Sequence, residues 1–96
     1  MKVLPVRCPS CSSVLSVRRL ACSACDTVVE GNFSPGVFAC LTADEQAFVL
    51  TFVKNSGSLK KMAVELKLSY PSVRNMLDEL IERMGQIERE IDNAHQ

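Results

Sequence analysis

The feature that most constrains this chain is a doubled cysteine pattern near its N-terminus. Cys8 and Cys11 form one Cys-x-x-Cys turn, Cys22 and Cys25 form a second, and ten residues separate the two turns. A turn of this kind places two thiolates on one side of a tight loop, and two such loops can complete a tetrahedron around a metal ion. The pattern therefore predicts one structural zinc ion with four ligands: Cys8, Cys11, Cys22 and Cys25.

Other roles suit these cysteines less well. A dithiol redox pair needs a single Cys-x-x-Cys turn that opens a helix, and neither turn precedes a helical pattern. No histidine or carboxylate joins the pattern, so a four-thiolate site would keep no open position, as in a structural metal centre. A four-thiolate set also suits iron, and the sequence leaves that alternative open. The fifth cysteine, Cys40, stands apart, and we interpret it as a small buried hydrophobic residue.

The segments around the two turns predict a zinc ribbon. Short apolar stretches at residues 14–20 and 28–29 alternate with turn residues, as short strands do. The ten-residue gap is short for such a site, which predicts a stubby hairpin joining the turns. The position after each second cysteine favours glycine, because its φ is often positive, but here it holds Ser12 and Asp26. Serine tolerates a positive φ less well than aspartate, so we expect slight strain in the first turn.

After residue 40 the spacing of apolar residues becomes helical, and the apolar face expected on the first helix consists of Phe48, Val49, Phe52 and Val53. Thr42 and Glu45 form a capping-box pair that predicts a helix to about residue 54, and Ser58 and Ser69 are the expected N-caps of a second and a third helix. The sequence thus predicts a small α+β fold. The expected parts are a zinc ribbon at residues 1–33, a linker at 34–40, a helix-turn-helix at 41–84 and a helical extension at 85–96. In the linker, Ser34-Pro35-Gly36 is expected to form a turn, which Val37 and Phe38 are expected to hold in place by packing.

Residues 59–77 fit a helix-turn-helix. This motif needs a small residue where the two helices cross, a turn, and apolar contacts from the second helix. Ala63 is the small residue, Leu68 is expected to plug the turn, and Val73 is expected to pack below it. The turn position before Leu68 is commonly glycine, so Lys67 must either take an unfavourable backbone conformation there or alter the turn.

The net charge of zero argues against strong non-specific binding of nucleic acid, but the charges are unevenly distributed. Residues 58–76 hold four basic and one acidic residue, a net charge of +3, whereas residues 77–96 hold two basic and six acidic residues, a net charge of −4. Only the first two turns of the third helix can therefore approach DNA without repulsion. The expected DNA-contacting residues are Lys60, Lys61, Ser69, Tyr70, Ser72, Arg74 and Asn75.

The third helix also carries a heptad seam of apolar residues. Its members are Val73, Leu77, Leu80, Met84, Ile87 and Ile91. Such a seam favours a homodimer through a coiled coil, and the alternative is an amphipathic helix that folds back on the chain's own core. DNA contact by the basic residues also has an alternative. They can simply solvate the surface of a three-helix module that docks on another protein.

These motifs together resemble a bacterial family of short proteins, catalogued as a domain of unknown function, with an N-terminal zinc ribbon and a C-terminal helix-turn-helix. The resemblance covers about residues 7–84, and its helical part also looks like region four of bacterial sigma factors, which reads promoter DNA. It implies a transcriptional regulator. The residues that carry it are Cys8-Pro9-Ser10-Cys11, Cys22-x-x-Cys25, Glu30-Gly31-x-Phe33, Leu41-Thr42-x-x-Glu45, Gly57-Ser58-Leu59-Lys60 and the segment from Leu68 to Asn75.

The sequence favours a cytoplasmic DNA-binding regulator with a structural zinc ion. The alternative is a protein-interaction adaptor that docks on RNA polymerase or another regulatory partner. An enzyme is not expected, because His95 is the single histidine and the chain has no glycine-rich phosphate loop or nucleophile–base pair. No apolar run is long enough to cross a membrane, and the N-terminus has no signal-peptide core, so we expect reduced thiols and a cytoplasmic location.

Overall fold

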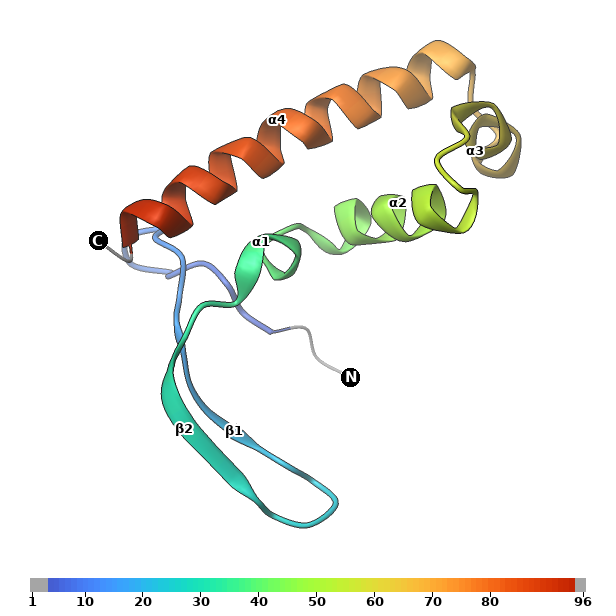
Figure 1. Cartoon of the computed structure of the whole chain (residues 1–96). Coiled ribbons are helices and arrows are strands. Elements are labelled where there is room, and N and C mark those ends of the chain that lie inside the picture. The colour runs from blue at the N-terminus through green and yellow to red at the C-terminus, as the bar shows by residue number, and fades with distance from the viewer. Residues whose placement is uncertain (1–3, 95–96) are drawn as a thin grey trace.

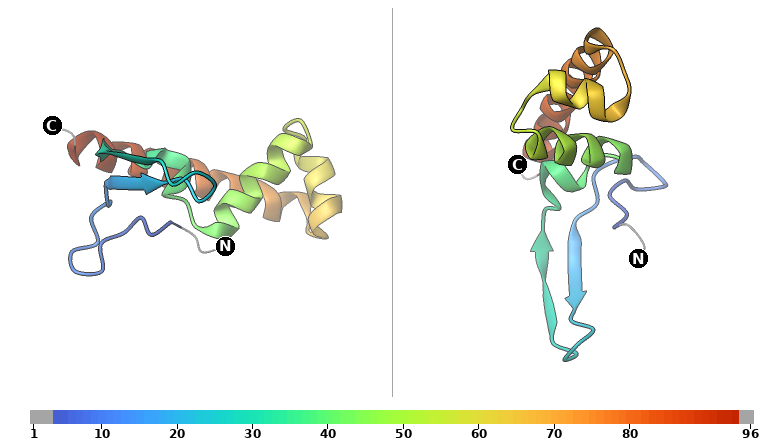
Figure 2. Two further views of the ribbon diagram at one scale, coloured as in Figure 1. Left: turned by 90° about the horizontal axis from the view of Figure 1, so that it is seen from below. Right: turned by 90° about the vertical axis from the view of Figure 1, so that its right-hand side faces the viewer.

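The computed structural model describes residues 4–94 and consists of a β-hairpin followed by four helices (Figure 1). The helices lie together at one end of the molecule, and the hairpin projects away from them (Figure 2). This architecture confirms the predicted small α+β fold. The elements are β1 (Val17–Ala21), β2 (Val28–Phe33), α1 (Gly36–Ala39), α2 (Ala43–Lys54), α3 (Leu59–Leu66) and α4 (Tyr70–Ala94).

The predicted capping residues set the ends of the helices. At the start of α2, the Glu45 backbone N–H donates to Thr42 Oγ1 at 3.1 Å, and the Thr42 N–H donates to Glu45 Oε1 at 2.8 Å. The Ser58 hydroxyl accepts the Lys61 N–H at 3.2 Å and begins α3. The Ser69 hydroxyl accepts the Ser72 N–H at 3.2 Å at the start of α4. These contacts confirm all three predicted caps.

The turn between α3 and α4 has the expected strained residue. Lys67 takes a left-handed conformation with φ of 59° and ψ of 41°. This lets the Leu68 N–H donate to the Ala63 carbonyl at 3.0 Å and ends α3 in one residue. The left-handed Lys67 confirms the unfavourable conformation expected at this turn, which costs a non-glycine residue about 1 kcal/mol.

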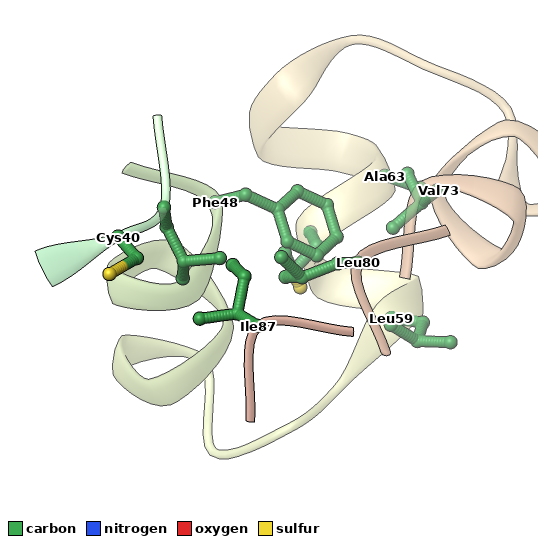
Figure 3. Close-up of a cluster of buried hydrophobic side chains, with 9 residues drawn as sticks. Cys40, Phe48, Leu59, Ala63, Val73, Leu80 and Ile87 are labelled. Carbon is green, nitrogen blue, oxygen red and sulfur yellow. The ribbon is translucent and has the colours of Figure 1, made fainter. Parts of the chain in front are cut away.

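Nine side chains form one apolar core, and most come from the helices. Figure 3 shows Val73 beside Ala63 of α3, Leu80 beside the Phe48 ring of α2, and Ile87 on the side of Cys40. The burial of Cys40 confirms its interpretation as a core residue. The core members are Cys40, Leu41, Phe48, Leu59, Met62, Ala63, Val73, Leu80 and Ile87.

The heptad seam of α4 faces this core. Val73, Leu80 and Ile87 are buried, and the intervening Leu77, Met84 and Ile91 are partly buried against the same cluster. The sequence left open whether this seam forms a coiled-coil dimer or packs on the chain's own core. In the structure it packs on the chain's own core. A homodimer through these six residues would first have to open the core, and the helical extension after residue 84 belongs to that core through Ile87.

Three apolar residues do not take the buried positions that the sequence favoured. The expected linker contains the single-turn helix α1, in which Val37 packs on the core while Phe38 points outward and is 61% exposed. Leu68 is 43% exposed instead of plugging its turn, because the left-handed residue before it redirects the chain. Val53, expected on the apolar face of α2, is 65% exposed.

An ion pair joins the start of α2 to α4. Arg83 Nε donates to Glu45 Oε1 at 2.9 Å, so this carboxylate serves both the capping box and the helix contact. Partial burial favours a higher pKa for the Glu45 carboxyl. The hydrogen bonds from Thr42 and Arg83, together with the charge of Arg83, outweigh burial and hold the pKa below its ordinary value.

We expect Leu80→Ala to destabilise the helical part by about 2–4 kcal/mol, because Leu80 is only 5% exposed and its removal leaves a cavity in the core. The matched control is Ile81→Ala on the next residue of the same helix, which is 56% exposed and should lose at most about 0.5 kcal/mol. Urea unfolding followed by circular dichroism measures both. Equal losses in the two variants would contradict the assignment of the buried face.

We expect Glu45→Gln to remove a pH dependence while keeping the cap. The folded-state pKa of Glu45 is lowered, so its charge stabilises the fold above the ordinary pKa of 4.5, and that contribution is lost as the pH falls below this value. Glutamine can still accept the Thr42 N–H, so stability at pH 7 should fall by only about 0.5–1 kcal/mol. The difference in unfolding free energy between wild type and variant should shrink from pH 6 to 3. A constant difference over that range would contradict the ion-pair role.

Candidate metal centre and candidate nucleic-acid interface

The first cysteine turn is held by three backbone features. The Ser12 N–H donates to the Cys8 carbonyl at 2.8 Å, the Cys8 N–H donates to the Ser13 carbonyl at 2.9 Å, and Ser12 has a φ of 65°. The Ser10 N–H also approaches Cys8 Sγ at 3.4 Å. These bonds close a tight loop with both thiols on it.

The second cysteine turn repeats this geometry. The Asp26 N–H donates to the Cys22 carbonyl at 2.8 Å, the Cys22 N–H donates to the Thr27 carbonyl at 2.8 Å, and Asp26 has a φ of 61°. The positive φ expected after each second cysteine is therefore present in both turns. Since the two loops have the same backbone bonds, each has the form of one half of a four-thiolate site.

A hydroxyl group supports one thiol in each turn. Cys11 Sγ is hydrogen-bonded to Ser13 Oγ at 3.4 Å, and Cys25 Sγ to Thr27 Oγ1 at 3.0 Å. Side-chain and then backbone hydrogen bonds from Ser13 lower the pKa of Cys11, and those from Thr27 lower the pKa of Cys25. The thiolate is the form that binds metal, so these contacts favour coordination. Neither hydroxyl was predicted as part of the site, although each stands two residues after the second cysteine of its turn.

The structure does not bring the two turns together. Within residues 4–94, no group of three or more His, Cys, Asp or Glu side chains is arranged to hold a metal ion. The first turn lies beside the C-terminal end of α4, whereas the second closes the far end of the hairpin (Figures 1 and 2). The four cysteines thus form two half-sites, and their role as a common ligand set stays a prediction.

The reason for the separation is the course of β1. The short gap predicted a hairpin joining the two turns, and this is wrong: the hairpin encloses the second turn, because Leu20 pairs with Val29 and Ala21 pairs with Val28. Residues between the turns therefore stay extended. Five residues in β1 carry the second turn about 16 Å further along the strand.

The first turn is fastened to the helical part. Arg7 forms an ion pair with Glu90 of α4 and also donates to the Ser12 carbonyl at 3.1 Å. This contact raises the pKa of Arg7 and lowers that of Glu90. Val6 and Val14 pack against the apolar core on either side of the turn. The first half-site is thus part of the folded body.

The expected DNA-contacting residues all lie on the surface. Four of them lie in the first two turns of α4, and Ser69 directly precedes that helix. Lys60 and Lys61 lie in the first turn of α3, at the end of that helix away from α4. Arg74 also has a partner that was not predicted, since its Nε lies 3.4 Å from Asp78 Oδ1 one turn further along. The four on α4 are Tyr70, Ser72, Arg74 and Asn75.

Comparisons with protein families agree with this division of the chain. The description of one matching family model is "Domain of unknown function (DUF2089)-HTH", over residues 41–87, and that of the other is "DUF2089 zinc ribbon", over residues 8–39. The chain belongs to the DUF2089 family. This confirms the resemblance drawn from the sequence, and it gives the DUF2089 chain a zinc-ribbon region followed by a helix-turn-helix region. No curated protein and no solved structure matched it.

Among residues 4–94 of this DUF2089 chain, no helix is both long and apolar enough to span a membrane. His95, the single histidine, lies outside the described residues.

We expect the backbone at position 12 to control metal affinity in this DUF2089 chain. Ser12→Gly should bind Zn²⁺ at least as tightly as wild type, because glycine takes the observed φ of 65° without strain. Ser12→Val should weaken binding by about tenfold, since a β-branched residue resists this conformation by 1–2 kcal/mol or so. Competition with a chelator measures both affinities. Equal affinities for the glycine and valine variants would contradict the half-site geometry.

Proposed function

We propose that this DUF2089 chain is a DNA-binding transcriptional regulator with a structural zinc ion. The observation that carries the proposal is the exposed, polar start of α4, which follows a tight turn after α3. Helix-turn-helix proteins place such a helix start in the major groove of double-stranded DNA. The match to a family described by its helix-turn-helix supports the same function.

Burial of one residue orients this part of α4. Val73 is completely buried, while its neighbours Ser72 and Arg74, and Asn75 after them, are exposed. Arginine can make a bidentate contact with guanine and asparagine with adenine, so Arg74 and Asn75 are the proposed base-reading residues. Lys60, Lys61 and Ser69 are proposed to contact phosphates.

Charge limits how much of α4 can approach DNA. After Arg74 the exposed surface of the helix becomes acidic, with Asp78, Glu79 and Glu82 in the next two turns. These carboxylates repel phosphates, so the proposed contact ends near residue 76. Because Asp78 also pairs with Arg74, it competes with DNA for that guanidinium.

Zinc has a structural role in this proposal. When bound by Cys8, Cys11, Cys22 and Cys25, it would cross-link the two turns and hold the ribbon in one conformation, with no coordination position left for a substrate. We propose no catalytic role for the chain. The free thiols of these residues also suit a reducing compartment such as the cytoplasm.

A specific surface favours the second candidate, a protein-interaction adaptor. An apolar groove runs between α1 and α2, and three of its side chains are largely exposed: Phe38 at 61%, Leu50 at 56% and Val53 at 65%. Exposed apolar patches of this kind mark protein contacts. RNA polymerase or another regulatory protein could dock there, with or without DNA bound at α4.

The decisive test is selection of bound sequences from a random DNA pool by the metal-loaded protein. We expect an enriched motif whose affinity falls steeply with salt, and we expect Arg74→Ala to weaken it by tenfold or more. The matched control is Arg89→Ala, which removes the same exposed side chain about 22 Å further along α4 and should leave binding unchanged. Asp78→Asn should strengthen binding, because it releases Arg74 and removes a negative charge.

No enrichment from a protein with intact helical circular dichroism would reject the DNA-binding function. The adaptor would then be the better candidate, and substitution of Val53 by aspartate should abolish capture of a partner, with little effect on the fold because this side chain is 65% exposed.

A further inference from the structure

We infer that this chain forms a twofold dimer through the apolar groove between α1 and α2. In this dimer the α2 helices of two copies lie antiparallel, with Leu50 of each copy close to the twofold axis. The second candidate function places another protein in the same groove, but the charges in and around the groove favour a second copy. The inference uses neither a metal ion nor DNA binding.

The α2 helix is apolar on two sides. One side has the buried Phe48 and the partly buried Phe52, which pack on the core. The other side has Leu50 and Val53, which are 56% and 65% exposed. At about 100° per residue, the apolar side chains together cover roughly 200° of the helix surface, about twice the stripe of a helix that packs on one side only. A helix with this pattern fits a packing partner on its second side.

The second side of α2 belongs to a groove that is apolar and uncharged. Gln46 is its polar residue, and the Gln46 side-chain amide donates to the Leu41 carbonyl at 3.0 Å, so this donor already has a partner within the chain. Among residues 4–94, the side chains that line the groove include no charged group. They are Phe38, Ala39, Leu41, Gln46, Val49, Leu50 and Val53.

The lack of charge suits contact with an identical surface. A twofold interface brings each group close to groups of its own kind, so a charged face would repel itself. The groove between α2 and α4 shows the contrast, because three carboxylates and one guanidinium line it: Asp44, Glu45, Glu79 and Arg83. Two copies that met through that groove would repel each other. The groove between α1 and α2 has no such barrier.

The charges at the two ends of α2 favour the antiparallel direction. Asp44 lies in the first turn of the helix and Lys54 in the last. An antiparallel pair brings Lys54 of each copy toward Asp44 of the other, whereas a parallel pair would oppose like charges. The helix dipoles favour the same direction. Leu50 lies midway between Gln46 and Val53 along the exposed side, so it is the residue expected nearest the axis.

The size of the patch determines how tight the dimer is. The exposed parts of Phe38, Leu50 and Val53 amount to an area on the order of 300 Å². A standard stable interface buries about 800 Å² on each partner. These three side chains therefore form the apolar centre of the contact, and the polar residues around them supply the rest. We expect a dimer whose dissociation constant lies in the micromolar range.

A dimer of this kind has a consequence for DNA, which rests on the proposed function. The twofold axis relates the starts of two α4 helices, so the bound DNA should contain two half-sites in inverted repeat. The dimer itself does not rest on that function. A dimer without an enriched DNA motif would reject DNA binding and keep the inference, and an enriched motif without inverted repeats from a monomer would do the opposite.

The test is an exchange of charge at Leu50. Sedimentation equilibrium of the zinc-loaded, full-length protein is measured from about 1 μM to 1 mM for wild type, Leu50→Lys and Leu50→Glu. Wild type should be a dimer at the high concentrations. Each variant alone should dimerise at least tenfold more weakly, because like charges meet near the axis. An equimolar mixture of the two variants should recover the dimer, since opposite charges then face each other.

The matched controls are Ile81→Lys and Ile81→Glu. Ile81 lies on α4 outside the groove and is 56% exposed, the same fraction as Leu50. Both control variants should dimerise like wild type. Circular dichroism checks that every variant keeps its helices, which the exposure of both positions leads us to expect.

Zinc-loaded wild type that stays monomeric up to 1 mM or so would overturn the inference. The groove would then be covered by the chain's own ribbon or be left for a different protein. Equal dimerisation of Leu50→Lys and Ile81→Lys would overturn it as well, because the contact would lie elsewhere. A mixture of the two Leu50 variants that stays monomeric would contradict the antiparallel contact of α2 with α2.

Discussion

Val73, Leu80 and Ile87 recur every seven residues along α4, and each is buried against a different part of the chain. The first packs near α3, the second near Phe48 of α2, and the third near Cys40 after α1 (Figure 3). Each buried side chain contributes about 1.5–3 kcal/mol. The three short helices have no other long partner, so this seam sets their order along α4. It also fixes which side of the start of α4 is exposed.

Local features of the fold could be predicted from the sequence because they depend on neighbouring residues. The caps at Thr42, Ser58 and Ser69 follow from side chains that reach their own backbone, and the left-handed Lys67 follows from the shortness of one turn. Which apolar residue is buried is harder to predict, as Phe38 and Leu68 show. The seam has the same pattern whether it packs on its own chain or on a second chain, so periodicity could not distinguish these two cases.

The candidate metal centre divides in the same way. The spacing of the cysteines and the positive φ of Ser12 and Asp26 are properties of single turns, and the sequence predicted them. The relative placement of the two turns depends on how β1 pairs. Pairing with β2 after the second turn keeps the intervening residues extended, and nothing in the cysteine spacing distinguishes this from a fold-back. The outward position of Arg74 was accessible from the sequence, and its pairing with Asp78 was visible in the four-residue spacing.

The ion pair between Arg7 and Glu90 has a consequence for the geometry of any complex. It attaches the first cysteine turn to Glu90, which lies twenty residues after Tyr70 on the same uninterrupted helix. This separation is about 30 Å. The α4 helix thus fixes the distance between Tyr70 and the anchored cysteine turn. If Tyr70 lies at a major groove and the helix axis follows the duplex, the anchored cysteine turn falls about nine base pairs away, close to one full repeat of B-form DNA. If the helix axis points away from the duplex, α4 keeps the first cysteine turn away from DNA. The turn is then accessible to a protein bound next to this chain.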